Sequence, residues 1–415
     1  MKRVLPFLAT TLAVCLAQAQ EVATSPASVD YEELPELKAS EILKPEFLKG
    51  PHYTVREPVP TASGANQYAI DSDYGVFEAD GNEMLLQRIK EIYLIAKLKD
   101  VSRTDQFKES LVTAAKAPLN AAKNVVKDPV NAVSSASKGL MKFMGRTAQT
   151  VKNVSKGQAQ KVSTDDALGY NKTKKKVAVS LGVDPYTTNS VLQKELDDIA
   201  WASWAGGFTF SAATFPISGP VGAALTMTNV SSAIGEMLAK KSPAELKAIN
   251  RSTLRAMGTS AKDTERFLSN TAFTPTYQTQ FVFNLKSLSG VENRGAFVGA
   301  AAEVSSNDSD ALFCVETSAL MSQLHKGDHP LARIAMIENL PICIAKDGTV
   351  IVALQWDYAA WTPMAERFVE SLQAQNAPNS SYLAFLSGVV SPRLRQELES
   401  RHFRVEDRVA SGPLK

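Results

Sequence analysis

The sequence predicts an α+β protein in which a helical N-terminal domain buries an uncharged helical hairpin and a mostly antiparallel α+β domain follows. Three observations indicate this class. Apolar residues recur at helical spacing, with capping signals, up to about residue 275. Beyond Thr274 they form short strand-like runs between turn residues. Residues 199–235 carry no charged side chain, although 21% of the 415 residues are charged.

The N-terminus has the pattern of a secretory signal peptide. Lys2 and Arg3 precede an apolar stretch over residues 4–16, and Ala17-Gln18-Ala19 supplies a small-x-small cleavage pattern. We therefore expect residues 1–19 to be removed, a mature chain that starts at Gln20, and a periplasmic or otherwise exported protein. A lipoprotein signal that ends at Cys15 is the alternative, which Val14 disfavours.

Residues 20–62 are expected to form a Pro-rich extended arm, because proline fixes φ and restricts the residue before it. The six prolines of this arm are Pro26, Pro35, Pro45, Pro51, Pro58 and Pro60. An extended piece follows over 68–77. Asp80-Gly81 then signals a turn, and Asn82 can cap a helix through "EMLLQRIKEIYLIAKLK". The helical domain is expected to span 63–275.

A basic amphipathic segment is predicted over residues 104–156. At about 100° per residue its cations fall on one side of a helix and its apolar residues on the other. The candidate binding cations are Lys116, Lys123, Lys127, Lys138, Lys142 and Arg146. The segment could cover the protein's own core, lie on an anionic membrane surface, or bind an anionic envelope polymer. Nucleic acid is not expected, because aromatic residues do not alternate with the cations.

Capping signals predict the remaining helices of this domain. Thr164 opens one helix, which Gly182 ends, and Ser190 with Gln193 forms a capping box for the next. Ser242-Pro243-Ala244-Glu245 is a stronger box, for a helix that ends near Gly258, and another helix runs over 261–270.

The uncharged run 199–235 is divided by Pro216 and Pro220. Its first arm of 17 residues would reach about 25 Å, short of a bilayer core of about 30 Å. Many hydroxyl and small side chains lie in both arms. We expect two packed helices inside a soluble core, with a membrane-inserting hairpin as the alternative.

Residues 276–415 are predicted to form the α+β domain. Strands are expected over 277–285, 295–304, 311–324, 332–339, 341–345 and 349–358, and helices over 362–375 and 391–402. Asp347-Gly348 indicates a hairpin. Cys314 and Cys343 lie in two of these runs, and an exported chain favours a disulfide between them over two buried free thiols.

Catalytic motifs are weak in this sequence. His325 and His329 lie in a turn without further ligands nearby, so no metal and no cofactor are expected. "SASK" at 135–138 lies within the basic segment and is interpreted as a chance match. The best polar group among aromatics is Asp357, beside Trp356, Tyr358 and Trp361, where a sugar or peptide ring could bind; a packed strand-to-helix corner is the alternative.

Residues 168–201, "LGYNKTKKKVAVSLGVDPYTTNSVLQKELDDIAW", resemble a family of exported proteobacterial proteins of unknown function. The resemblance implies a cell-envelope setting and no activity. Together with the composition it favours an exported envelope protein with a non-catalytic binding or structural role. The alternatives are an enzyme with a site near Asp357 and a membrane-inserting hairpin protein.

Overall fold

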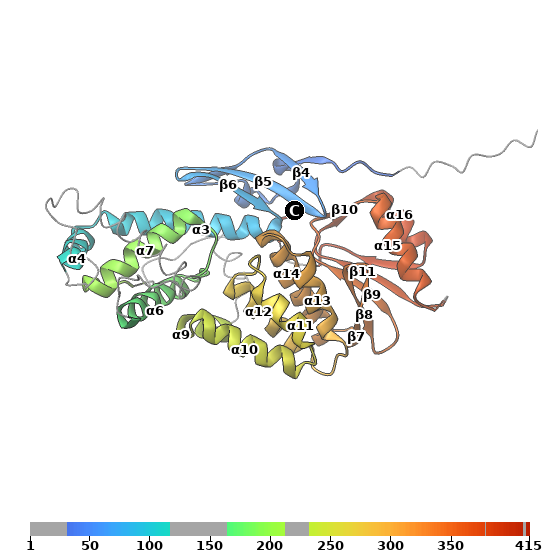
Figure 1. The fold of residues 1–415 in the computed structure, drawn as a ribbon. Coiled ribbons are helices and arrows are strands. Elements are labelled where there is room, and N and C mark those ends of the chain that lie inside the picture. Colours follow the sequence, from blue (N-terminus) through green and yellow to red (C-terminus); the bar gives the residue numbers. More distant parts are fainter. Residues whose placement is uncertain (1–30, 117–163, 212–231, 378, 410–411) are drawn as a thin grey trace, which may run out of the picture.

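The protein has an α+β fold, shown as a computed structural model in Figure 1. The structure describes residues 31–116, 164–211, 232–377, 379–409 and 412–415. The predicted signal peptide, most of the predicted basic segment and residues 212–231 of the uncharged run lie outside these residues. Five of the candidate cations also lie outside them: Lys123, Lys127, Lys138, Lys142 and Arg146.

A six-stranded antiparallel sheet occupies the N-terminal part, so the prediction that 20–62 is only an extended arm was wrong for its described residues. The strands are β1 (Glu36–Lys38), β2 (Lys49–Gly50), β3 (Tyr53–Val55), β4 (Pro58–Ala62), β5 (Ala65–Ser72) and β6 (Gly75–Asp80), with the short helices α1 (Ala39–Ile42) and α2 (Pro45–Leu48) between β1 and β2. Pro58 and Pro60 are tolerated because this half of β4 pairs only with β1.

The buried face of this sheet packs on α3 (Asn82–Ser102), which lies beneath it in Figure 1. Alternate residues of β5, Tyr68 and Ile70, point into the shared core. Gly81 rather than Asn82 is the N-cap of α3. The Asn82 side chain is buried and bonds instead to Tyr68 and Asn66.

The middle of the chain is helical, as predicted. Its helices are α4 (Asp105–Lys116), α6 (Thr164–Ser180), α7 (Ser190–Ala205), α9 (Ser232–Lys240), α10 (Pro243–Ala256) and α11 (Ala261–Ser269). The Ser242–Glu245 capping box is confirmed. The cap of α7 is Asn189, one position before the predicted Ser190. Within the described residues, no helix is long and apolar enough to cross a membrane.

Three segments predicted as strands, 277–285, 295–304 and 311–324, are helical instead. They belong to α12 (Pro275–Ser287), α13 (Arg294–Val304) and α14 (Asp308–Lys326). Apolar and small polar residues are buried along most of α12 and α14, so no exposed face gives these segments a helical period.

The C-terminal sheet has the strand order β13-β11-β9-β8-β7. Its strands are β7 (Leu331–Ile337), β8 (Leu340–Ala345), β9 (Val350–Leu354), β11 (Tyr382–Leu386) and β13 (Phe403–Glu406). The predicted hairpin at Asp347-Gly348 joins the antiparallel β8 and β9. β9, β11 and β13 are mutually parallel. The sheet is therefore mixed, which corrects the expectation of a mostly antiparallel sheet.

Both faces of this sheet are covered by helices. α13 and α14 pack on one face, and the predicted helices α15 (Pro363–Ala374) and α16 (Pro392–Ser400) pack on the other. Along β9, Val350, Val352 and Leu354 enter the core beneath α15 and α16, whereas Ile351 and Ala353 face the opposite core. The helical crossovers α15 and α16 explain the parallel strands, because parallel pairing requires long connections.

Segments far apart in the sequence are joined at two places. Glu32 accepts hydrogen bonds from the Trp361 N–H and the Ser391 hydroxyl, each 2.6 Å long. Leu43 forms an antiparallel bridge with Leu414. Both termini of the described chain are thereby fixed against the rest of the fold.

Cys314 and Cys343 are free buried thiols, so the disulfide expected between them is not present in the structure. Cys314 lies on α14 rather than on a strand, and Cys343 lies on β8. The Cys314 thiol contacts the Ser305 hydroxyl at 3.7 Å. The pairing rested on both cysteines being in strands, and α14 removes that basis.

Candidate functional site

A cavity of about 410 Å³ lies at the carboxyl ends of the three parallel strands. Gln355 follows β9, Ser387 follows β11 and Arg408 follows β13 by two residues, and all three line the cavity. Ligands of sheets with parallel strands bind in the crevice outside these ends. The volume is within the range of small-molecule sites. We call this space the carboxyl-edge cavity.

The other walls of the carboxyl-edge cavity come from distant parts of the chain. Lys44 comes from the residue before α2, Asn82 and Glu83 from the first turn of α3, and Gly412, Leu414 and Lys415 from the C-terminal segment. The antiparallel bridge of Leu43 with Leu414 fixes the first and last of these walls together.

Three cations line the carboxyl-edge cavity. Lys44 donates to the Gly412 carbonyl at 2.9 Å, and Lys415 donates to the Ser40 carbonyl at 2.5 Å. Arg408 donates to the main-chain oxygen of Lys415 at 3.3 Å. Among the described residues, neither lysine has an Asp or Glu side chain within ion-pair distance. Their partners are carbonyl oxygens rather than acidic side chains, so basic side chains outnumber acidic ones on the cavity wall.

Glu83 is the acidic residue of the cavity wall. Its side chain is half-buried and makes no hydrogen bond or ion pair with any residue that the structure describes. Burial, and secondly the charge of Asp357, raise the pKa of the Glu83 carboxyl. Because the Glu83 carboxyl has no partner among the described residues, a charged ligand in the cavity would change its pKa.

Asp357 lies behind this wall and does not line the cavity. Its carboxylate accepts the backbone N–H groups of Asn66 and Asn82, each at 3.0 Å. Burial raises the pKa of Asp357 to about 7, and the two N–H donors oppose this shift because they favour the charged form. Asp357 thus fixes the corner between β5 and α3, and with it the position of Glu83.

The aromatic residues predicted around Asp357 form a packed corner. Trp356 lies against Gly64, where an added Cβ would approach the indole to 2.4 Å. Tyr358 lies in the two-residue strand β10 (Tyr358–Ala359), which pairs with β12 (Val389–Val390). Trp361 is fully buried, with the Arg401 guanidinium 4.7 Å from its ring centroid. The structure brings these residues together, but the cavity is lined by the adjacent Gln355 instead.

A second, smaller cavity of about 70 Å³ shares Glu83 with the first. We call it the inner cavity, and its polar lining residues are Glu83, Gln87, Lys90, Glu91, Asp184, Thr276, Tyr277, Gln280 and Glu316. One face of α3 lies along the inner cavity, because the lining residues Glu83, Gln87 and Lys90 recur at helical spacing. Burial raises the pKa of Asp184 to about 6, although hydrogen bonds from Thr276 and the Tyr186 N–H oppose the shift.

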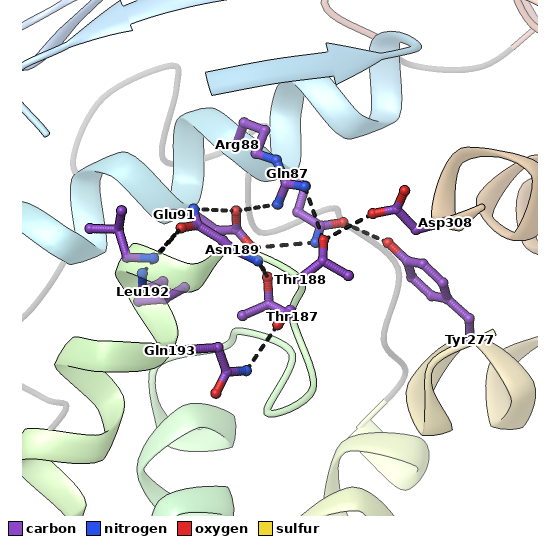
Figure 2. Close-up of polar contacts among 11 residues, drawn as sticks. Gln87, Arg88, Glu91, Thr187, Thr188, Asn189, Leu192, Gln193, Tyr277 and Asp308 are labelled. Atoms are coloured by element: carbon purple, nitrogen blue, oxygen red, sulfur yellow. Dashed lines mark hydrogen bonds and ion pairs between the residues drawn. The ribbon is translucent and has the colours of Figure 1, made fainter. Parts of the chain in front are cut away.

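Figure 2 shows the polar network beside the inner cavity, which joins α3 to the loop before α7. Glu91 accepts from Arg88 at 2.7 Å, from the Asn189 side chain at 2.9 Å and from the Thr187 hydroxyl. The Asn189 side-chain oxygen in turn caps α7. The network fixes the orientation of α3 relative to the helical region.

The same network reaches the C-terminal helices (Figure 2). Thr188 accepts from Arg88 at 3.1 Å and donates to Asp308, at the start of α14, at 2.9 Å. Tyr277 of α12 donates to Gln87 at 3.2 Å. Hydrogen bonds therefore connect α3, which carries Glu83, to the loop before α7 and to α12, and that loop to α14.

The remaining predicted site residues lie elsewhere. Lys116 is exposed at the end of α4 and is far along the chain from the cavity residues. His325 lies in the last turn of α14, and its ring nitrogen accepts the Leu331 N–H at 3.1 Å, while His329 lies in the following loop. Among the described residues, no group of His, Cys, Asp or Glu is arranged to hold a metal ion.

Sequence reasoning missed the cavity residues. A signal existed for Gln355 and Ser387, because each follows an apolar strand run. It could be interpreted only if the strands were known to be parallel. The strand before Arg408, Phe403–Glu406, alternates apolar and charged residues and gave no such signal. No local pattern indicates Lys44, Glu83 or Lys415. Comparison of the chain with protein-family models, curated proteins and solved structures finds no match.

Proposed function

We propose that this protein is an exported, non-catalytic binding protein that holds a small anionic molecule in the carboxyl-edge cavity. One observation carries the proposal: the carboxyl ends of three parallel strands meet Lys44, Arg408 and Lys415 around a space of about 410 Å³. A site of this size at this edge of a sheet has the location and volume typical of small-molecule sites.

The lining chemistry favours binding over catalysis. Ser387 is the only hydroxyl among the described lining residues, and it donates to the Trp356 carbonyl at 2.8 Å. That carbonyl occupies the proton that a base would have to remove, and no histidine is among the described lining residues to act as the base. An enzyme with a site near Asp357 remains the alternative, with Glu83 as its acid or base.

The cell-envelope setting rests on the signal-peptide pattern of residues 1–19. Residues 101–180 hold 15 basic and 5 acidic side chains, which favours contact of the segment 104–156 with an anionic membrane surface or polymer. The buried hairpin expected over 199–235 is supported only at its start, where Ile199 and Ala202 are buried on α7. α7 ends at Ala205 and residues 206–211 are not helical, so the expected first arm is not one helix over 199–215.

Isothermal titration calorimetry on the mature protein tests the proposed ligand class. The probes are inorganic phosphate, succinate, glutarate, citrate, aspartate and glutamate. We expect at least one Kd below about 1 mM, and a weakening of about tenfold in Lys44→Gln and in Lys415→Gln. Lys49→Gln is the matched control, because Lys49 is exposed and does not line the cavity.

Two results would contradict the proposal. One is that none of the six anions binds. The other is that binding occurs but responds equally to Lys44→Gln and Lys49→Gln, which would place the anion outside the cavity.

A further inference from the structure

We infer that the ligand of the carboxyl-edge cavity carries an ammonium group as well as an acidic group, as free amino acids and other small zwitterions do. The inference rests on the proposed function and concerns the same cavity. It is drawn from Glu83, because the binding of an anion by the three cations does not explain an acidic side chain in the same cavity wall.

The two charge types enter the cavity from different elements. Lys44 comes from the N-terminal segment, Arg408 and Lys415 come from the C-terminal segment, and Glu83 comes from α3. None of the three cations lies within ion-pair distance of Glu83. The protein thus presents an acidic group and a basic group separately to one space of about 410 Å³.

A ligand ammonium would give the Glu83 carboxylate the partner that it lacks. Buried carboxylates are normally paired or hydrogen-bonded, because an uncompensated buried charge is costly. In this structure Glu83 instead experiences burial and the negative charge of Asp357. A cation at this wall offsets both, whereas an anion alone would leave Glu83 unpaired or require it to be protonated.

Several charged groups lie around Glu83, and of these Asp357 raises its pKa. Asp357 lies behind it, and Lys44, Arg408 and Lys415 line the carboxyl-edge cavity with it. On the side of the inner cavity the charged groups are Lys90 and Glu91 of α3, Asp184 of the loop between α6 and α7, and Glu316 of α14. Because burial and Asp357 raise the pKa of Glu83, part of the free protein carries a proton there near neutral pH.

The sign of the pH dependence separates two kinds of ligand. A ligand ammonium stabilises ionised Glu83, so binding releases the proton and affinity rises as the pH rises towards the pKa of Glu83. A plain anion favours protonated Glu83 as a hydrogen-bond donor, so its affinity falls over the same range. Each slope is at most about tenfold per pH unit.

The test compares amino acids with the acids that lack only the amino group. Aspartate is paired with succinate, glutamate with glutarate and alanine with propionate, and each is titrated calorimetrically at pH 5.5 to 8.5. We expect the amino member of at least one pair to bind about 30-fold tighter or more and to release protons on binding. Glu83→Gln should remove that preference and leave the affinity of the acid member within about threefold.

Circular dichroism checks whether Glu83→Gln is folded, and Lys49→Gln serves again as the control. If succinate, glutarate or propionate binds as tightly as its amino partner, with affinity that falls as pH rises, the inference is wrong and the proposed function stands. If no member of any pair binds, nor phosphate or citrate, the inference and the proposed function both fail.

Discussion

Removal of the Glu91 carboxylate is expected to destabilise the fold severely. Glu91 is 1% exposed and accepts hydrogen bonds from Arg88, Thr187 and Asn189. In Glu91→Ala the Arg88 guanidinium stays buried and keeps only its bond to the Thr188 hydroxyl. The buried Asn189 side chain loses its acceptor for Nδ2 as well.

The magnitude follows from these contacts. Loss of one partner of a buried ion pair costs about 3–5 kcal/mol, because the other charge is left uncompensated. The two neutral donors that lose an acceptor add about 1 kcal/mol each. A total of about 5–7 kcal/mol is comparable with the whole stability of many proteins, about 5–15 kcal/mol. Glu91→Gln keeps an acceptor oxygen and should cost less.

Urea unfolding followed by circular dichroism measures this effect as the shift in midpoint at unchanged slope. Arg251→Ala is the matched control. It breaks a salt bridge with Glu265 whose side chains are 41% and 56% exposed, and such exposed pairs contribute about 0–1 kcal/mol. The reasoning is refuted if Glu91→Ala costs less than about 2 kcal/mol, or no more than Arg251→Ala.

Three further predictions concern the corner at Asp357 and the cysteines. Because burial raises the pKa of Asp357 to about 7 from 3.8, the folded state binds this proton more tightly than the unfolded chain. The free energy of unfolding should therefore rise as pH falls from 7 towards 4. In urea unfolding, Asp357→Asn should reduce the difference in this free energy between pH 7.5 and pH 5 by up to about 3 kcal/mol. A difference that Asp357→Asn leaves unchanged would contradict the prediction. Gly388→Ala places a Cβ 2.1 Å from the Asp357 carbonyl oxygen and should cost about 1–3 kcal/mol, whereas Gly412→Ala, with nothing within 4 Å of its added Cβ, should change thermal stability little. Burial raises the pKa of Cys314 and Cys343 to about 12, so a thiol reagent should modify both only in denaturant; a disulfide-linked peptide in the mass spectrum of the unreduced protein would show the opposite.

The helices of the middle region and the last two helices were predictable because their ends carry explicit capping residues. Ser242, Thr362 and Ser391 each accept a backbone N–H bond as the N-cap, followed by proline at the first helical position. The strands β7, β8 and β9 were predictable because turn residues separate short apolar runs. These signals are local, so a single sequence reveals them.

The sequence predicted the wrong secondary structure where an element is buried on most of its sides, or where a strand pairs with a segment that is distant in the sequence. α14 is buried on most of its circumference, so its apolar residues follow no helical period, although Asn307 caps it. The strands β1, β2 and β3 have only two or three residues each, and their pairing partners supply the stabilisation that their own sequence does not indicate. For the same reason the candidate site could not be predicted, because Lys44 and Gly412 lie 368 positions apart.

The bridge between the first and last described segments has a consequence for the order of folding. Glu32 and Ser391 are 359 positions apart, and Ser40 and Lys415 are 375 apart. Contacts of such sequence separation form late and slow folding, because loop closure must be completed first. The wall of the carboxyl-edge cavity that Lys415 contributes is absent until residue 415 has been synthesised. A nascent chain therefore holds Glu32 and Ser40 without their partners until the segment 391–415 has emerged.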